Sequence, residues 1–146
     1  MADESLLIDK WLYDTLSTNA TIITDTVIHQ GSTFHIYEGV APASLNQARW
    51  VVWQMQSARD IRAVGGIRML VECVYIVKVI TTGSGYSVKP LVDAIDTAMD
   101  RKQIVTGYVR IEECIRDGPF RLNETRGDIT YRQRGGVYRI RAQVPL

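Results

Sequence analysis

The chain has 146 residues, of which 46% are hydrophobic, and its formal net charge is +1. A chain of this size buries about two-thirds of its unfolded surface as one unit, so we expect a single domain over residues 1–146. No apolar run reaches the roughly 18 residues that cross a bilayer, and the N-terminus lacks the basic and apolar regions of a signal peptide. We therefore expect a protein that is made in the cytoplasm and has no membrane partner.

Charge is unevenly divided along the chain. Residues 1–100 carry 7 basic and 11 acidic side chains, which gives −4, whereas residues 101–146 carry 10 basic and 5 acidic, which gives +5. Such asymmetry indicates either contact with an anionic partner or subunits that meet head to tail through unlike faces.

The first element is a predicted helix over about residues 4–18. Its apolar residues recur at helical spacing after Asp3, which we take as the N-cap, and the pattern stops near Asn19. Residues 20–33 mix β-branched and polar residues, so we expect an irregular or weakly stranded segment that crosses to the next element. A short strand at 34–37 and a loop containing Ala41-Pro42 follow.

A long β-hairpin is predicted over residues 50–64 and 67–81. Its second arm alternates strictly and has one wholly apolar face, and Gly65-Gly66 supplies the two positive φ angles that a tight turn requires. The turn fixes a register with three pairs of matched chemistry, namely Arg59 with Glu72, Trp53 with Lys78, and Val52 with Val79.

The length of this hairpin allows two interpretations. Arms of about fifteen residues span roughly 50 Å, whereas a compact domain of this size is about 40 Å across. Either the hairpin curls around the rest of the domain, or its tip projects toward another molecule. The tip gathers the charged residues Arg59, Asp60, Arg62 and Arg68.

The second half of the chain predicts a helix over about residues 88–102, with an apolar stripe and with Pro90 in its first turn. A strand at 108–115, a polar loop at 116–127 and a second hairpin at 128–144 follow. We therefore expect an α+β fold, in which a mostly antiparallel sheet built on the long hairpin carries both helices on one face.

The second hairpin is predicted to turn at Gly135-Gly136. That turn would put four basic side chains on one face of the ribbon, namely Arg132, Arg134, Arg139 and Arg141. Two interpretations stay open for this arginine face. It is either a solvated face that guards an exposed edge, or a patch for carboxylates of a neighbouring subunit or for phosphates.

The sequence carries little that indicates catalysis. His29 and His35 have no cysteine or carboxylate at metal-ligand spacing, and Gly83-Ser84-Gly85 lacks the remaining residues of a phosphate-binding loop. Glu112 and Glu113 are adjacent, so on a strand they point to opposite faces. We predict that the protein is not an enzyme and that it has no catalytic residues, cofactor or metal.

The order of elements resembles the tail completion or tail terminator proteins of tailed bacteriophages. The local cues are the Ala41-Pro42 loop, the strand Trp50-Val51-Val52-Trp53-Gln54, and the terminal Arg134-Gly135-Gly136-Val137-Tyr138. The chain departs from the usual form by having Ala48-Arg49-Trp50 where members often have a Pro-aromatic pair.

This resemblance implies a virion structural protein at the head-proximal end of the viral tail. Members form a ring, commonly a homohexamer, that caps the tail tube, ends its polymerisation and offers a surface to the head connector or head completion protein. DNA passes through such a ring without sequence-specific binding. The resemblance brings no catalytic residues with it.

Three functions remain open from the sequence. The first is a structural protein that acts through ring assembly, and it requires a discrete oligomer. The second is a small polyanion- or nucleic-acid-binding domain that uses the arginine face, and it requires salt-sensitive binding. The third is an enzyme whose site the sequence does not reveal, and it requires turnover.

Overall fold

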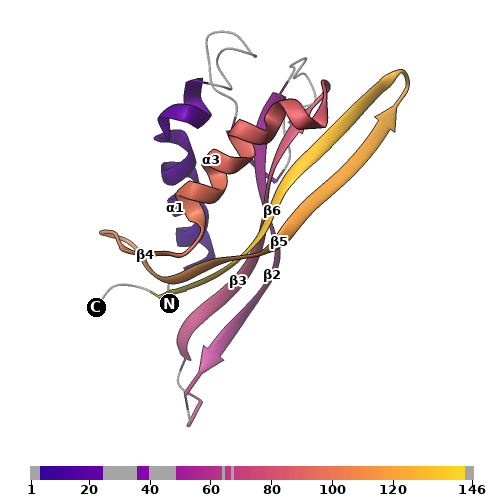
Figure 1. Cartoon of the computed structure of the whole chain (residues 1–146). Coiled ribbons are helices and arrows are strands. Elements are labelled where there is room, and N and C mark those ends of the chain that lie inside the picture. Colours follow the sequence, from indigo (N-terminus) through magenta and orange to yellow (C-terminus); the bar gives the residue numbers. More distant parts are fainter. Residues whose placement is uncertain (1–3, 25–35, 40–48, 64, 67, 144–146) are drawn as a thin grey trace.

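A computed structural model describes residues 4–24, 36–39, 49–63, 65–66 and 68–143. In chain order the elements are α1 (Glu4–Ser17), β1 (Ile36–Glu38), β2 (Arg49–Arg62), β3 (Arg68–Thr81), the 3₁₀ helix η1 (Gly85–Val88), α3 (Lys89–Met99), β4 (Lys102–Val105), β5 (Arg110–Arg126) and β6 (Ile129–Gln143). The strands form one six-stranded sheet in the order β1-β2-β3-β6-β5-β4. Only the β1–β2 pair is parallel, and α1 and α3 lie on the same side of the sheet (Figure 1). The α+β class is therefore confirmed.

The core lies between the two helices and the face of the sheet that they cover, which we call the helix face. The apolar stripes of both helices meet alternate residues of β3, as the helical and strand periods require. The members from α1, β3 and α3 that are exposed by 2% or less are Ile8, Leu12, Leu16, Cys73, Tyr75, Val77, Val79, Leu91, Ile95 and Met99.

Two buried tyrosines fix the helices to the sheet. The Tyr75 hydroxyl donates a hydrogen bond to Asp9 of α1 (3.0 Å), and the Tyr138 hydroxyl donates one to Asp96 of α3 (3.0 Å). Burial, reinforced by the neighbouring carboxylate, raises the pKa of each hydroxyl, so both remain neutral donors. Each helix is thus held by a directional bond in addition to apolar contact.

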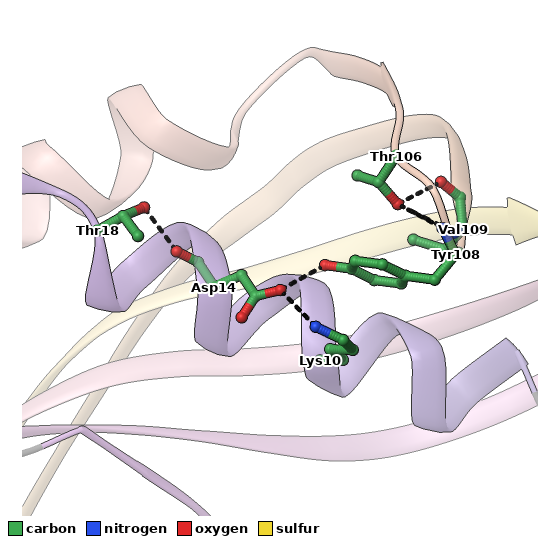
Figure 2. A network of polar contacts seen from close by, with 6 residues as sticks. All are labelled: Lys10, Asp14, Thr18, Thr106, Tyr108 and Val109. Carbon is green, nitrogen blue, oxygen red and sulfur yellow. Dashed lines mark hydrogen bonds and ion pairs between the residues drawn. The ribbon is translucent and has the colours of Figure 1, made fainter.

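A third polar contact joins α1 to the turn between β4 and β5. Asp14 accepts hydrogen bonds from the Tyr108 hydroxyl (2.7 Å) and from Lys10 (2.9 Å), as Figure 2 shows. These bonds lower the pKa of Asp14, and burial, together with the bond to Asp14, raises the pKa of Tyr108 to about 12. The turn itself is closed by Thr106, whose hydroxyl donates to the Val109 carbonyl (2.9 Å) and accepts from its N–H (3.0 Å).

The β2–β3 hairpin shows where the predicted register is right and where it is wrong. Arg59 lies opposite Glu72, as predicted, but β2 contains a bulge between Met55 and Ser57. On the far side of the bulge every pair shifts by one residue. The predicted pairs Trp53–Lys78 and Val52–Val79 are therefore wrong, and the observed pairs are Trp53 with Val77 and Val52 with Lys78. An extra residue in one strand leaves the alternation of the other strand unchanged, so the pattern of β3 gives no sign of it.

The predicted second hairpin at 128–144 is wrong. Gly135 and Gly136 lie inside β6, which pairs continuously with β3, and neither has a positive φ angle. The hairpin turn lies instead at Gly127-Asp128, where Gly127 has a φ of 62°. A glycine at the first of two turn positions is the requirement of a II′ turn. The predicted polar loop at 116–127 is consequently the second half of β5.

Gly135 is needed because β3 and β6 approach closely, not because the chain turns. A Cβ atom on Gly135 would lie 2.1 Å from the Val77 carbonyl oxygen and 2.6 Å from the Lys78 Cα. Glycine inside a strand commonly marks such an approach. A Cβ atom on Gly136 would meet side chains instead of backbone, namely the Arg116 guanidinium (2.8 Å) and the Tyr138 ring (3.0 Å).

Two hairpin arms leave the body of the sheet in opposite directions (Figure 1). The β3–β6 pairing runs from Val71–Ala142 to Thr81–Arg132. Beyond the first pair β2 and β3 continue to Arg62 and Arg68, and beyond the second pair β5 and β6 continue to Arg126 and Ile129. We call the whole β2–β3 hairpin and the whole β5–β6 hairpin, each with its projecting end, the β2–β3 arm and the β5–β6 arm. The long hairpin therefore projects at its tip, and so does a second one.

Replacing Gly135 by alanine should lower the free energy of unfolding by about 3 kcal/mol, because the added methyl group forces β3 and β6 apart. Gly118→Ala is the matched control, since nothing lies within 4 Å of a Cβ built there. Urea denaturation of both variants provides the measurement. Equal stability of the two would contradict a close β3–β6 approach.

Candidate interaction surfaces

The four arginines that were predicted to share one face lie on two. β6 pairs with β3 without any shift of register, so its successive side chains alternate between faces. Arg132 and Arg134 lie on the helix face, and Arg139 and Arg141 lie on the opposite face, which we call the reverse face. The single arginine face is therefore wrong, because it depended on a turn at Gly135-Gly136.

On the reverse face, a network of ion pairs crosses four strands. Glu72 of β3 accepts from Arg59 of β2 (2.9 Å) and from Arg141 of β6 (2.7 Å), and Arg141 also lies 3.3 Å from Glu113 of β5. The hydrogen bond from Arg141, more than that from Arg59, holds the pKa of Glu72 below its ordinary value, and Glu72 in turn raises the pKa of Arg141. The arginines of this face therefore have structural partners.

The other predicted interface residues also divide. Arg139 lies 3.6 Å from Asp117 on the reverse face. At the end of the β2–β3 arm, Arg62 lies 3.2 Å from Asp60 and donates to the Gly66 carbonyl (2.9 Å). Arg68 begins β3 opposite Arg62 in the backbone register.

The helix face of the β5–β6 arm is different. An open groove of about 480 Å³ lies between this arm and the η1–α3 segment. Its basic lining residues are Lys89, Arg116, Arg121 and Arg134, and Tyr86 at its side is 82% exposed. Lys89 and Arg116 form ion pairs with Asp93 and Asp96 of α3. We call this the arginine groove.

Arg121 and Arg134 of the groove lining, and Arg132 beside Arg134, have no acidic partner in the described part of the chain. Arg134 donates to the Leu122 and Gln133 carbonyls and to the Asn123 side chain, at 2.8–3.3 Å. Arg132 donates to the Gly83 carbonyl (3.0 Å), and Arg121 lies directly opposite Arg134. Burial, and then repulsion from Arg121 and Arg132, lowers the pKa of Arg134.

The turn before α3 is shaped to hold Arg134. A Cβ atom on Gly85 would lie 2.9 Å from one terminal nitrogen of the Arg134 guanidinium. The Gly83-Ser84-Gly85 segment, interpreted from the sequence as a plain turn, thus supports two arginines of the arm. Sequence reasoning missed Arg121, because residues 116–127 were predicted to be a loop, and it did not single out Lys89 at the start of the second helix. The Gly127-Asp128 turn is the signal that could have identified the strand.

Within the described residues, no group of three or more His, Cys, Asp or Glu side chains is arranged to hold a metal ion. No helix in that part of the chain is both long and apolar enough to span a bilayer. The two histidines considered in the sequence, His29 and His35, lie outside the described residues.

Glu72 should couple more strongly to Arg141 than to Arg59. The Arg59 side chain is 70% exposed and that of Arg141 is 37% exposed, so solvent screens the first pair more. Double-mutant cycles with Glu72→Gln, Arg59→Met and Arg141→Met should give coupling energies of about 0.5 kcal/mol for Arg59 and about 1.5 kcal/mol for Arg141. A larger coupling energy for Arg59 than for Arg141 would show that the network depends mainly on the ion pair between β2 and β3.

The Glu72 network also predicts a pH dependence of stability. The pKa of Glu72 is lower in the folded state than in the unfolded state, so its contribution is complete above the unfolded pKa, about 4.3, and is lost as the pH falls through the folded value. The Glu72→Gln variant should be less stable near neutral pH and should lose less stability on acidification. Urea denaturation between about pH 3 and pH 6 tests this, and parallel pH profiles would contradict it.

Comparison with known proteins gives a likeness to a solved structure. No protein-family description matches the chain, and no curated protein matches it. A chain in the solved virion of a native gene transfer agent particle matches with a TM-score of 0.67 and 17% sequence identity, over 90% of each chain. The protein therefore has the same fold as a chain of that virion.

Proposed function

We propose that this protein is a virion structural protein that forms a ring at the head-proximal end of a phage-type tail tube. There it ends tube polymerisation and offers a surface to the head connector or head completion protein. The observation that carries the proposal is the likeness to a chain of a virion particle, which spans 90% of both chains. The finer part of the proposal, a ring at the end of the tail tube, rests on the sequence resemblance to tail completion and tail terminator proteins.

The two arms supply surfaces for assembly. A two-stranded ribbon is only marginally stable in water, so an arm that projects from the sheet gains from a neighbour. On the reverse face of the β5–β6 arm, Leu122 and Ile129 are 48% and 46% exposed. Because the arms point in opposite directions, one subunit can contact two neighbours through unlike surfaces (Figure 1). Such head-to-tail contacts generate rings when the rotation closes.

A ring protein of this kind acts through assembly and needs no catalytic group or cofactor. The described ion pairs serve to join strands and helices, and the proposal assigns none of them to chemistry. A second candidate function, a polyanion-binding domain, is favoured by Arg121, Arg132 and Arg134, which have no carboxylate within ion-pair distance among the described residues.

Mass measurement in solution, combined with electron microscopy of the purified protein, tests the ring. We expect a discrete oligomer whose mass is a fixed multiple of the 16.5-kDa chain, six-fold for a hexamer, and annular particles. A protein that stays monomeric at all concentrations would overturn the proposal, and so would open filaments, because a ring requires closure.

Shortening either arm should prevent assembly without unfolding the subunit. Replacing residues 62–69 by Asn-Gly keeps the Ile61–Leu70 pair and adds a favoured two-residue turn, and replacing residues 125–130 by Asn-Gly keeps the Glu124–Tyr131 pair. We expect folded monomers in both cases, shown by an unchanged circular dichroism spectrum and a reduced mass. If both shortened proteins assemble normally, the arms are not subunit contacts.

A further inference from the structure

Some charged residues form no ion pair within the described part of the subunit, and the basic ones among them outnumber the acidic ones. Among the residues whose side chains are described, three acidic groups have no basic partner, namely Asp9, Glu38 and Asp128. The basic residues that likewise have no acidic partner are Lys78, Lys102, Arg121, Arg132 and Arg134. Two of the acids lie together at one edge of the sheet, and three of the bases lie together at the arginine groove.

The two acids belong to a mixed surface around Trp53. Glu38 of β1 is exposed and lies beside Trp53 in the strand register, and the Trp53 ring N–H donates to Asp9 of α1 (3.2 Å). The Tyr13 ring lies 6.2 Å from the Trp53 ring. Large exposed apolar side chains of the same elements accompany the acids, namely Leu6 (66%), Tyr13 (44%) and Met55 (46%). We call this surface, formed by Leu6, Asp9, Tyr13, Glu38 and Met55, the edge patch.

The arginine groove has complementary properties. Arg121 is exposed and has no hydrogen-bonding partner among the described residues, so all five of its N–H donors are available. Arg132 and Arg134 are held in place by carbonyl and amide oxygens, which leave their positive charges unneutralised. Tyr86 adds an exposed aromatic ring. The groove can therefore take carboxylates and apolar side chains together.

We propose that the edge patch of one copy of this chain docks in the arginine groove of the next copy. β1 and β5 are separated by four strand spacings, about 19 Å, so the two surfaces lie apart on one subunit and both remain free to meet another. Because the surfaces differ, the contact is head to tail, which is the type that a ring needs. This inference rests on the proposed ring and names the surfaces that close it.

The charge pattern favours a protein carboxylate over a nucleic-acid backbone. Asp93 and Asp96 accompany Lys89 and Arg116 along the α3 side of the groove and would repel a continuous line of phosphates. The chain as a whole carries a charge of only +1, which provides little long-range attraction for a polyanion. An arginine pairs well with a single carboxylate, through two parallel hydrogen bonds.

Charge reversal tests the contact. The single variants Glu38→Arg and Arg121→Glu should each weaken assembly at least about tenfold at low salt, since like charges would then meet across the interface. The double variant, with both reversals in one chain, should recover assembly because the two reversed side chains again form a pair of opposite charges. Arg101→Glu is a matched control, as Arg101 is 89% exposed and lies outside both surfaces. Sedimentation equilibrium gives the association constants, and thermal unfolding checks that each variant is folded.

The outcomes separate this inference from the proposed function. If the wild type is monomeric, both are overturned. If it assembles but neither single reversal affects assembly, or the double variant shows no recovery, only the docking is overturned. Filaments that respond to the reversals and recover in the double variant would support the docking and overturn the ring. If Arg121→Glu assembles normally but loses binding to duplex DNA in a gel-shift assay, the groove is a nucleic-acid site and the docking is overturned.

Discussion

The close pairing of β3 with β6 is the constraint on which the rest of the structure depends. Each hairpin taken alone would be a two-stranded ribbon with little stability in water. The absence of a side chain at Gly135 lets the two ribbons join into one sheet, against which both helices can pack. Because β3 and β6 are antiparallel and adjacent, the hairpin turns lie at opposite ends of the sheet. The two arms and their opposite directions follow from this one pairing.

Much of the local structure could be predicted from the sequence because local physics determines it. The strict alternation of β3 requires one buried face, and the apolar stripes of α1 and α3 require helices that lie on the sheet. Gly65 and Gly66 adopt the predicted positive φ angles, 94° and 83°, although the strands end at Arg62 and Arg68 and the connection is longer than two residues. These features depend on neighbours in sequence, or on an average property such as burial.

The errors arose where a residue's role depends on a distant strand. Gly135-Gly136 is the same dipeptide as Gly65-Gly66. Gly135, however, is required by the close approach of the Val77 backbone and not by a turn. Nothing nearby in sequence distinguishes the two cases. Side chains alternate between the two faces of a strand with a period of two. Because β6 continues through Gly135-Gly136 without turning, Arg132 and Arg134 lie on one face and Arg139 and Arg141 lie on the other. The partner of Arg139 was hidden as well, because Asp117 lay in a segment predicted to be a loop.

The contrast between the two faces of β6 shows which arginines hold the subunit together. On the reverse face, Glu72 is 8% exposed and ionised, a state that is costly unless basic groups surround the carboxylate, and Arg59 and Arg141 meet that need. Both arginines therefore already have an acidic partner within the subunit. On the helix face, Arg121 stands directly opposite Arg134, an arrangement that destabilises an isolated hairpin. A subunit that only had to fold would gain nothing from keeping this repulsion, whereas a subunit that must bind an acidic surface gains a site whose charge is already assembled. We therefore propose that the arginines without an acidic partner among the described residues serve contacts in an assembly instead of the fold of the subunit.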